Sequence, residues 1–167
     1  MSTVTAPIAL SPQERDALAR VLARGFADSV DGLAESSERR WWRVMATEEF
    51  DAWLIDWPVA TSVHPHDHGG SAASISVLRG RLTELLLDDG AQRVATLQRG
   101  TVHRVSSGSV HDIANPGPAR ATSVHVYSPP LRTMGFYDRD GTRLRQEQVA
   151  VEPVLWDAVL PSSVGRG

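Results

Sequence analysis

Three histidines within five positions are the part of the sequence whose residue types point most directly to chemistry. His64, His66 and His68 lie in the stretch VHPHDHGG, and no Asp or Glu follows His68 until Glu84. Imidazole nitrogens are common ligands of divalent transition metals. Two side chains separated by one residue on a β-strand point to the same face and can converge on one ion. A metal site would therefore use a pair from this stretch and further ligands from elsewhere.

The neighbouring residues favour His66 and His68 as that pair. Pro65 restricts His64 to an extended or turn conformation and lacks an amide donor, which is typical of the entrance to a strand rather than its paired interior. The glycines at 69–70 follow His68 directly and permit the backbone to approach a bound group closely.

The composition excludes several other kinds of site. The 167 residues include no cysteine, so disulfides, thiolate ligands and a cysteine nucleophile are excluded. All 17 basic residues are arginine, which removes Schiff-base chemistry because that needs a lysine amine. The net charge of −3 offers no field for a nucleic acid, so we expect a small uncharged or zwitterionic partner. Neither a membrane span nor a signal peptide is predicted, and we expect the protein in the cytoplasm.

A helix is predicted at residues 11–25, where SPQERDALARVLARG carries several helix signals. Ser11 is the expected N-cap, Glu14 closes a capping box with it, and Gly25 is the expected stop. A second helix is predicted near residues 38–45.

From about residue 50 the pattern changes to short β-rich runs. They recur about every 8 to 12 residues between Gly, Pro, Asn and Asp. This spacing predicts an all-β fold, an antiparallel sandwich or barrel with two or so N-terminal helices packed outside. We expect a single domain over residues 1–167, with a helical part at about 11–46 and the β-barrel at about 50–158.

A second segment, GTVHRVSSGSVHDIAN at residues 100–115, brings in a family resemblance. Residues 66–80 resemble the first cupin motif, H-x-H-x4-E-x6-G, with His66, His68 and Gly80 in place and Ala73 where the glutamate belongs. Residues 100–115 resemble the second, G-x5-P-x-G-x2-H-x3-N, with Gly100, Gly108, His111 and Asn115 in place and Ser106 replacing the proline. The resemblance implies a cupin-type jelly roll whose metal ligands are His66, His68 and His111. His64 and His103 then have no part in the metal site.

The alanine at position 73 is the most informative departure from the motif. Most cupin sites have three histidines and a carboxylate, whereas three neutral imidazoles leave the ion its full 2+ charge and more open positions. Among cupins this pattern resembles the thiol dioxygenases, especially bacterial cysteine dioxygenase.

The stretch SVHVYSPPL at residues 123–131 agrees with this resemblance. It matches the family's Ser-x-His-x-Tyr motif followed by Ser-Pro-Pro. Because Ser123, His125 and Tyr127 are spaced by two on one strand, they share a face, and their side chains can form a hydrogen-bonded relay with Tyr127 toward the metal.

An arginine shortly before the first strand is expected to bind the substrate carboxylate, since a guanidinium fork matches a planar carboxylate. The family pattern has an aromatic residue two positions before this arginine and a Trp closing the strand. Trp41 and Trp57 fit those places and assign the role to Arg43, with Arg39 and Arg40 as competing candidates.

The resemblance, over about residues 38–145, implies an Fe(II)-dependent enzyme that uses O2. Cysteine would bind through its thiolate and amine, and both oxygen atoms would be added to sulfur to give cysteine sulfinic acid. Tyr127, oriented by His125 and Ser123, would donate a hydrogen bond to the reacting oxygen. Animal members crosslink this tyrosine to a cysteine at the position of Ala73, so Tyr127 is expected to work uncrosslinked.

Three other functions compete with this interpretation. The first is a dioxygenase for another small thiol such as 3-mercaptopropionate, whose enzymes have glutamine in place of the arginine. The second is a non-catalytic metal-containing cupin that binds a ligand, which would have no use for the relay that ends at Tyr127. The third is a cupin isomerase or quercetinase-like enzyme, whose site has the glutamate that Ala73 replaces.

Overall fold

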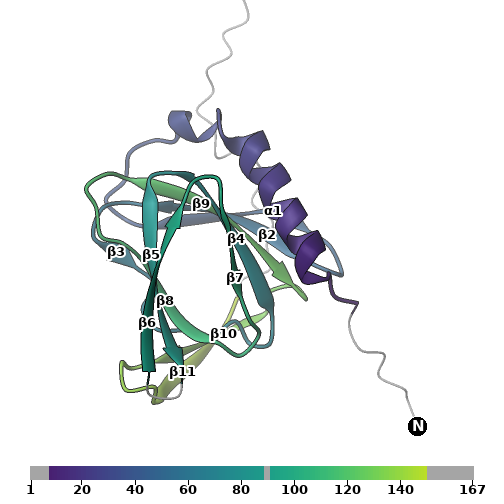
Figure 1. Cartoon of the computed structure of the whole chain (residues 1–167), viewed down its shortest axis with the longest axis vertical. Coiled ribbons are helices and arrows are strands. Elements are labelled where there is room, and N and C mark those ends of the chain that lie inside the picture. Colours follow the sequence, from purple (N-terminus) through teal and green to yellow (C-terminus); the bar gives the residue numbers. More distant parts are fainter. Residues whose placement is uncertain (1–7, 89–90, 150–167) are drawn as a thin grey trace, which may run out of the picture.

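Two antiparallel β-sheets face each other, and one α-helix lies against the outside of one of them (Figure 1). The structure, a computed structural model, describes residues 8–88 and 91–149. Its elements are α1 (Pro12–Phe26), the 3-10 turn η1 (Val30–Gly32), β1 (Arg40–Ala46), β2 (Asp51–Trp57), β3 (Thr61–Ser62), β4 (Ala72–Arg79), β5 (Arg81–Asp88), β6 (Ala91–Gln98), β7 (Val102–Val105), β8 (Val110–Asn115), β9 (Ala121–Ser128), β10 (Thr133–Tyr137) and β11 (Arg143–Gln148).

The strand order is that of a jelly roll and confirms the predicted fold class. One sheet has the order β1-β2-β9-β4-β7, and the facing sheet has the order β3-β8-β5-β6. The strands β10 and β11 form a hairpin outside these two sheets, and Phe136 of β10 also makes an isolated bridge with His66. Neighbours in each sheet are often far apart in the sequence, so the fold brings residues near 53, 75 and 125 side by side.

The central strands β2 and β9 are buried on both faces, which explains why most of their residues are apolar or small. Their inner faces carry Trp53, Ile55 and Tyr127 into the core between the sheets. Their outer faces carry Leu54 and Val124 into a second core beneath α1. Alternate side chains of one strand therefore serve two different cores.

The helix α1 begins as predicted and is tied to the sheet by a buried acid. Ser11 Oγ accepts from the backbone N–H of Glu14, and the Glu14 carboxylate accepts from the N–H of Ser11, so the capping box is confirmed. The helix continues through Gly25 to Phe26, so the predicted stop at Gly25 is wrong.

Asp16 is the acid that ties α1 to the sheet. It accepts a hydrogen bond from Ser74 Oγ at 2.7 Å and from the Nε and Nη2 of Arg104 at 3.0 and 2.8 Å. Ser74 belongs to β4 and Arg104 to β7, so one carboxylate joins the helix to two strands.

The second predicted helix, near residues 38–45, is wrong, because this segment contains strand β1. Its side chains alternate with a period of two: Trp41 borders the inner cavity, whereas Trp42 and Val44 pack in the core beneath α1. That alternation is possible only in an extended chain. The end of the barrel, predicted at 158, lies outside the described residues. No helix in residues 8–88 and 91–149 combines the length and apolarity needed to cross a membrane.

Candidate metal centre and substrate cavity

Three buried imidazoles converge inside the jelly roll. One ring nitrogen from each of His66, His68 and His111 lies within 4.8 Å of the others, and the Nε2 atoms of His68 and His111 are 3.1 Å apart. At most 3% of any of the three residues is exposed. The structure thus brings together the three histidines that the sequence singled out, in an arrangement that fits one divalent ion.

His111 lies on β8, whereas His66 and His68 lie on the loop between β3 and β4. His66 forms an isolated bridge with His111 through reciprocal backbone hydrogen bonds of 2.8 and 2.9 Å. Strand β4 begins only at Ala72. The loop histidines therefore converge through this bridge and a tight turn, and not through the strand alternation on which the sequence argument relied.

Asp67, between the two loop histidines, ties their loop to the β10–β11 hairpin. Its carboxylate accepts hydrogen bonds from the N–H of Gly69 at 2.8 Å, the N–H of Gly135 at 3.1 Å and the hydroxyl of Tyr137 at 2.5 Å. Gly69 has a φ of +56°, and a Cβ there would lie 2.0 Å from Thr133 Oγ1. The glycine thus permits close approach to the hairpin rather than to a bound group.

The hydrogen bonds behind the cluster leave imidazole lone pairs facing its centre. His66 Nδ1–H donates to the carbonyl oxygen of His64 at 2.8 Å, so its Nε2 carries the free lone pair. Burial, followed by the neighbouring His111, lowers the pKa of both His66 and His68 well below the ordinary value. Neutral imidazoles with free lone pairs fit a divalent metal.

His64 contributes its backbone and not its side chain. Its N–H donates to Asp112 Oδ1 at 3.1 Å, its carbonyl holds His66, and its φ is +72°. Its ring is not a member of the three-histidine cluster.

His111 is held by a buried carboxylate. Its Nδ1–H donates to Glu84 Oε1 at 2.7 Å, and the other oxygen of Glu84 contacts Nε2 of His103. Burial opposes the charge of Glu84, but hydrogen bonds from His103 and His111 lower its pKa to about 2. Glu84 is therefore a carboxylate that lies behind one histidine of the cluster instead of joining the cluster.

The three relay residues form the expected chain, with a fourth member. Trp57 Nε1–H donates to Ser123 Oγ at 2.9 Å, Ser123 Oγ lies 2.9 Å from His125 Nε2, and His125 Nδ1 lies 3.1 Å from the hydroxyl of Tyr127. Tyr127 in turn packs edge-on against His68, with ring centroids 4.9 Å apart.

Trp57 sets the direction of this chain. Burial lowers the pKa of His125 to about 3, so its ring is neutral and carries one N–H. The hydroxyl oxygen of Ser123 accepts a hydrogen bond from Trp57 Nε1–H. The hydroxyl hydrogen of Ser123 can then be donated to His125 Nε2, which lies within hydrogen-bond distance. His125 then donates from Nδ1 to the oxygen of Tyr127. Burial also raises the pKa of Tyr127, so its remaining O–H is kept and is free to donate into the cavity.

The arginine at the cavity is Arg39, a candidate that the sequence left open. Arg39 and Trp41 both line the cavity, and the guanidinium carbon lies 4.8 Å from the ring centroid of Trp41 and 5.3 Å from that of Trp57. Burial lowers its pKa, although an arginine remains a cation. Within residues 8–88 and 91–149, no carboxylate forms an ion pair with Arg39.

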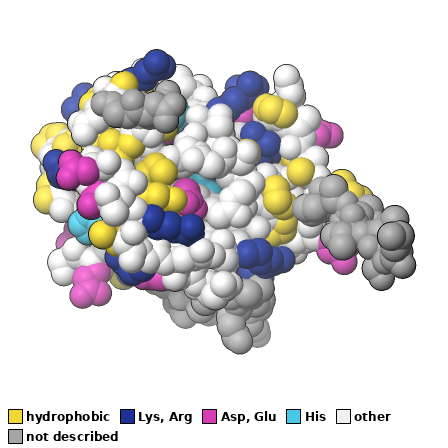
Figure 2. Space-filling view, turned by 90° about the horizontal axis from the view of Figure 1, so that it is seen from below, with side chains coloured by type: hydrophobic (Ala, Val, Ile, Leu, Met, Phe, Trp, Pro, Cys, Tyr) yellow, Lys and Arg dark blue, Asp and Glu magenta, His cyan; other side chains and the backbone are white. Residues whose placement is uncertain are grey.

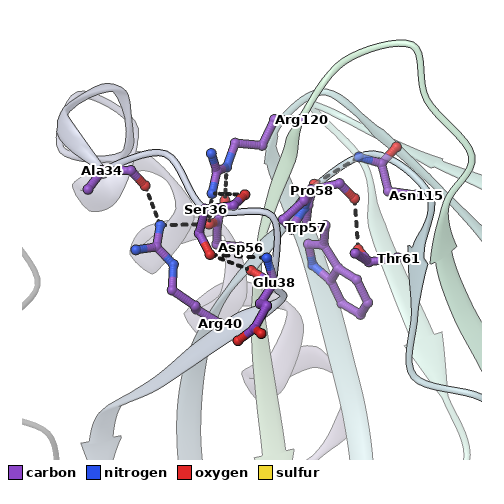
Figure 3. Close-up of polar contacts among 10 residues, drawn as sticks. All are labelled: Ala34, Ser36, Glu38, Arg40, Asp56, Trp57, Pro58, Thr61, Asn115 and Arg120. Carbon is purple, nitrogen blue, oxygen red and sulfur yellow. Dashed lines mark hydrogen bonds and ion pairs between the residues drawn. The ribbon is translucent and has the colours of Figure 1, made fainter.

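Arg40 does not line the cavity and instead reaches Asp56 and the backbone of Ala34 (Figure 3). Its Nη2 donates to the fully buried Asp56 at 3.0 Å and also to the carbonyl of Ala34. Arg120 donates two hydrogen bonds to the same carboxylate, from Nε at 2.6 Å and from Nη2 at 2.5 Å. Arg40 is therefore engaged in structure and not available to a ligand.

Arg43, the arginine assigned to the substrate carboxylate from the sequence, is buried but does not line the cavity. It pairs across β1–β2 with Trp53 and lies near Asp51, whose pKa is raised by burial and lowered in part by the arginine. Residues 39, 41 and 43 are spaced by two, although β1 itself begins only at Arg40. Position along the chain, rather than the face, separates Arg43 from the cavity.

The cavity has a volume of about 320 Å³ and is mostly apolar. Its polar groups come from the three histidines, His125, Tyr127, Arg39, Glu147 and Gln148, and Glu147 is paired with Arg145. The hairpin also supplies part of the wall through Met134 and Phe136. The other apolar side chains that line it are Trp41, Trp53, Ile55, Trp57, Val63, Ile113, Leu131 and Val149. Seen from below, little histidine surface is visible among the other side chains (Figure 2).

Ala73 lies next to Tyr127, as the family comparison of the sequence implied. In the β4–β9 pair the register partner of Ala73 is Tyr127, and Ala73 is fully buried. Neither a carboxylate nor a thiol is present there, so Tyr127 is uncrosslinked. The motif glycine Gly80 has a φ of +71°, and a Cβ there would lie 2.6 Å from the carbonyl of Arg120.

Comparison with known proteins gives both a family and a fold. The family model described as cysteine dioxygenase type I matches residues 32–140. Among solved structures, the TT1209 protein of Thermus thermophilus has a TM-score of 0.53 at 19% identity, covering 60% of this chain and 94% of its own.

Two further structures share the fold. A conserved protein of Klebsiella pneumoniae with a double-stranded β-helix domain has a TM-score of 0.52 at 20% identity, covering 60% of this chain and 86% of its own. An RmlC-like cupin of Methanocaldococcus jannaschii has a TM-score of 0.50 at 18% identity, covering 57% and 84% respectively. At these identities the likeness is one of fold alone.

Proposed function

Because the chain belongs to the cysteine dioxygenase type I family, we propose that it is an iron-dependent thiol dioxygenase that converts L-cysteine to cysteine sulfinic acid. The reaction RS⁻ + O2 → RSO2⁻ is balanced without a further reactant, because sulfur loses the four electrons that O2 gains. Fe(II) held by His66, His68 and His111 would supply the redox chemistry that makes O2 reactive toward the thiolate. The chain's own residues would bind the substrate, orient it and exclude water.

The observation that carries the proposal is the half-buried guanidinium of Arg39, which lines the cavity and forms no ion pair with a carboxylate among the described residues. The guanidinium of Arg39 lies against the rings of Trp41 and Trp57, and these cation–π contacts hold it at the cavity. A substrate carboxylate would supply the missing anion through two parallel hydrogen bonds. We therefore move the proposed carboxylate-binding role from Arg43 to Arg39.

Tyr127 is proposed to act on the opposite side of the substrate. Its free O–H donates into the cavity, and the chain of Trp57, Ser123 and His125 prevents the hydroxyl from turning away. With Arg39 holding one end of cysteine and the histidine cluster close to the other, the reactants are fixed before they react. The apolar walls keep water from the sulfur.

Oxygen consumption tests this function. The iron-loaded protein should consume O2 when L-cysteine is added and should form one sulfinate per O2, measured with an oxygen electrode and by mass spectrometry. L-Serine, which has the same shape without sulfur, should give no uptake. His111→Ala should lose both iron and activity, whereas His64→Asn, which tolerates the positive φ, should keep both. Iron-loaded protein that consumes no O2 with L-cysteine would overturn the proposal.

A further inference from the structure

Glu84 is an enclosed carboxylate that belongs to neither the cavity lining nor the histidine cluster. Only 4% of it is exposed, and its two oxygens contact different histidines. One oxygen accepts from His111 Nδ1 at 2.7 Å, and the other contacts Nε2 of His103. A buried carboxylate is costly unless it is fully hydrogen-bonded, so this arrangement calls for a role.

The register of the strands explains how Glu84 reaches both rings. In the β5–β8 pair, Glu84 is opposite Ile113 and Leu86 is opposite His111, so Glu84 and His111 are diagonal neighbours. Diagonal side chains are about 7 to 8 Å apart, which a glutamate spans and a shorter aspartate does not. His103 belongs to β7, in the facing sheet (Figure 1). Glu84 therefore joins the two sheets directly behind a metal ligand.

The three ligand histidines are supported in different ways. His66 is held by a backbone carbonyl, and Nδ1 of His68 has no hydrogen-bond partner among the described residues. Among the described residues, His111 is the member of the cluster whose Nδ1 is held by a side chain, that of Glu84. A substitution outside the cluster can therefore change the orientation of this ring.

We propose that Glu84 and His103 are positioning residues for the metal centre. Glu84 keeps the N–H of His111 on Nδ1, which turns the Nε2 lone pair toward the ion, and His103 fixes Glu84 from the facing sheet. This inference rests on the proposed metal centre but not on thiol oxidation. Supports of this kind change metal affinity by about 10- to 100-fold.

The test measures Zn²⁺ affinity by competition with a chromophoric chelator, because Zn²⁺ also accepts imidazole ligands and is redox-inert. Glu84→Met keeps the length but removes the hydrogen bonds, and should weaken binding by about 100-fold. His103→Leu should weaken it by about 10-fold, and His103→Gln, which restores an N–H donor near the Nε2 position, should recover most of the loss. The matched control His64→Asn should bind as the unchanged protein does.

A second readout separates positioning from general loosening of the fold. In the Zn²⁺-loaded protein, the Nδ1–H proton of His111 should give a far-downfield NMR signal that moves upfield in His103→Leu and is lost in Glu84→Met. His103 is partly exposed, so His103→Leu should keep the apo melting temperature.

Three outcomes overturn the inference. One is that Glu84→Met and His103→Leu, both folded, bind Zn²⁺ as tightly as the unchanged chain does. Another is that His103→Gln fails to regain affinity over His103→Leu. The third is that the unchanged chain binds no Zn²⁺, which would overturn the metal centre too. If Glu84→Met and His103→Leu bind Zn²⁺ weakly while the unchanged, iron-loaded protein shows no cysteine-dependent O2 uptake, the inference is upheld and only the proposed function is overturned.

Discussion

Trp57 donates its indole N–H to Ser123 over 2.9 Å while its ring lies 5.3 Å from the guanidinium of Arg39. One buried side chain thus supports both groups that we propose to hold the substrate, the arginine through its ring and Tyr127 through Ser123 and His125. The carbonyl of Trp57 is fixed in turn by Asn115 Nδ2 at 2.8 Å, which gives the asparagine of the second cupin motif its structural role (Figure 3).

Trp57→Phe separates these two functions, because phenylalanine keeps an aromatic ring but has no N–H. Loss of one hydrogen bond of about 1 to 1.5 kcal/mol should lower kcat about 10-fold. KM for cysteine should stay within about twofold, since the ring beside Arg39 remains. Ser123→Ala should give a similar loss, and the double variant should be little worse than either single one. A raised KM with unchanged kcat would contradict the directional relay.

Arg39→Gln and Arg43→Gln decide which arginine binds the carboxylate. Loss of a charge-assisted hydrogen bond costs about 1.5 to 3 kcal/mol, so Arg39→Gln should lower kcat/KM by about 10- to 150-fold. Arg43→Gln should leave KM near normal in the folded fraction and should lower the melting temperature, because it removes the cation beside Asp51.

Cysteine methyl ester provides the matching change in the substrate. It should be a poor substrate of the unchanged protein, and the difference between ester and acid should shrink in Arg39→Gln. If the difference shrank in Arg43→Gln instead, the assignment from the sequence would be right after all. The unchanged protein should also prefer cysteine over 3-mercaptopropionate in oxygen uptake.

Ala73→Cys should restore the crosslink of the animal enzymes. Residue 73 is the register partner of Tyr127, and facing Cβ atoms of such a pair lie about 4.5 to 5.5 Å apart. Iron and O2 in the presence of cysteine should join the new thiol to the tyrosine, with the loss of two hydrogen atoms in the intact mass. The control Ala72→Cys, one residue away and on the other face, should show no mass loss. An equal loss in both variants would speak against the β4–β9 register.

Asp16→Asn should destabilise the protein in a pH-dependent way. Burial opposes ionisation of Asp16, but Arg104 and Ser74 outweigh it and lower its pKa below 3.8. The stabilisation is thus present above the unfolded pKa and is lost as the pH falls through the folded one. At pH 7 the substitution should cost about 1 to 2 kcal/mol in the free energy of urea unfolding.

The pH profile of unfolding supplies the check on that prediction. The difference between Asp16→Asn and the unchanged protein should disappear at a pH below the folded pKa of Asp16. Asp31→Asn is the control, because that exposed carboxylate forms only a 3.5 Å contact with Arg79 and should contribute little at any pH. A loss that stayed constant with pH would mean that packing, and not the charge, explains it.

Features that depend on short-range spacing could be predicted from the sequence. The relay residues 123, 125 and 127 lie in contact as expected, because residues spaced by two on a strand always share one face of the sheet. Motif spacing singles out the three histidines that the structure brings together, although His66 and His68 lie on a loop and not on the strand that the spacing predicts.

Features that depend on strand pairing could not be predicted. Arg39, Trp41 and Arg43 are spaced by two, but Arg39 precedes β1 and lines the cavity, whereas the β1–β2 register places Arg43 opposite Trp53. The contact of Glu84 with His103 needs two sheets to meet, and nothing in either local sequence indicates it.

The attachment of the loop that carries His66 and His68 to the hairpin has a consequence for the order of folding. Asp67 and Gly135 are hydrogen-bonded although they are 68 residues apart in the chain. Contacts of this separation form late, because their loop-closure entropy is recovered only when the intervening strands have joined. The unfolded chain therefore holds no preformed metal site, and metal added during refolding should not speed the rate-limiting step, although it should slow unfolding of the completed fold.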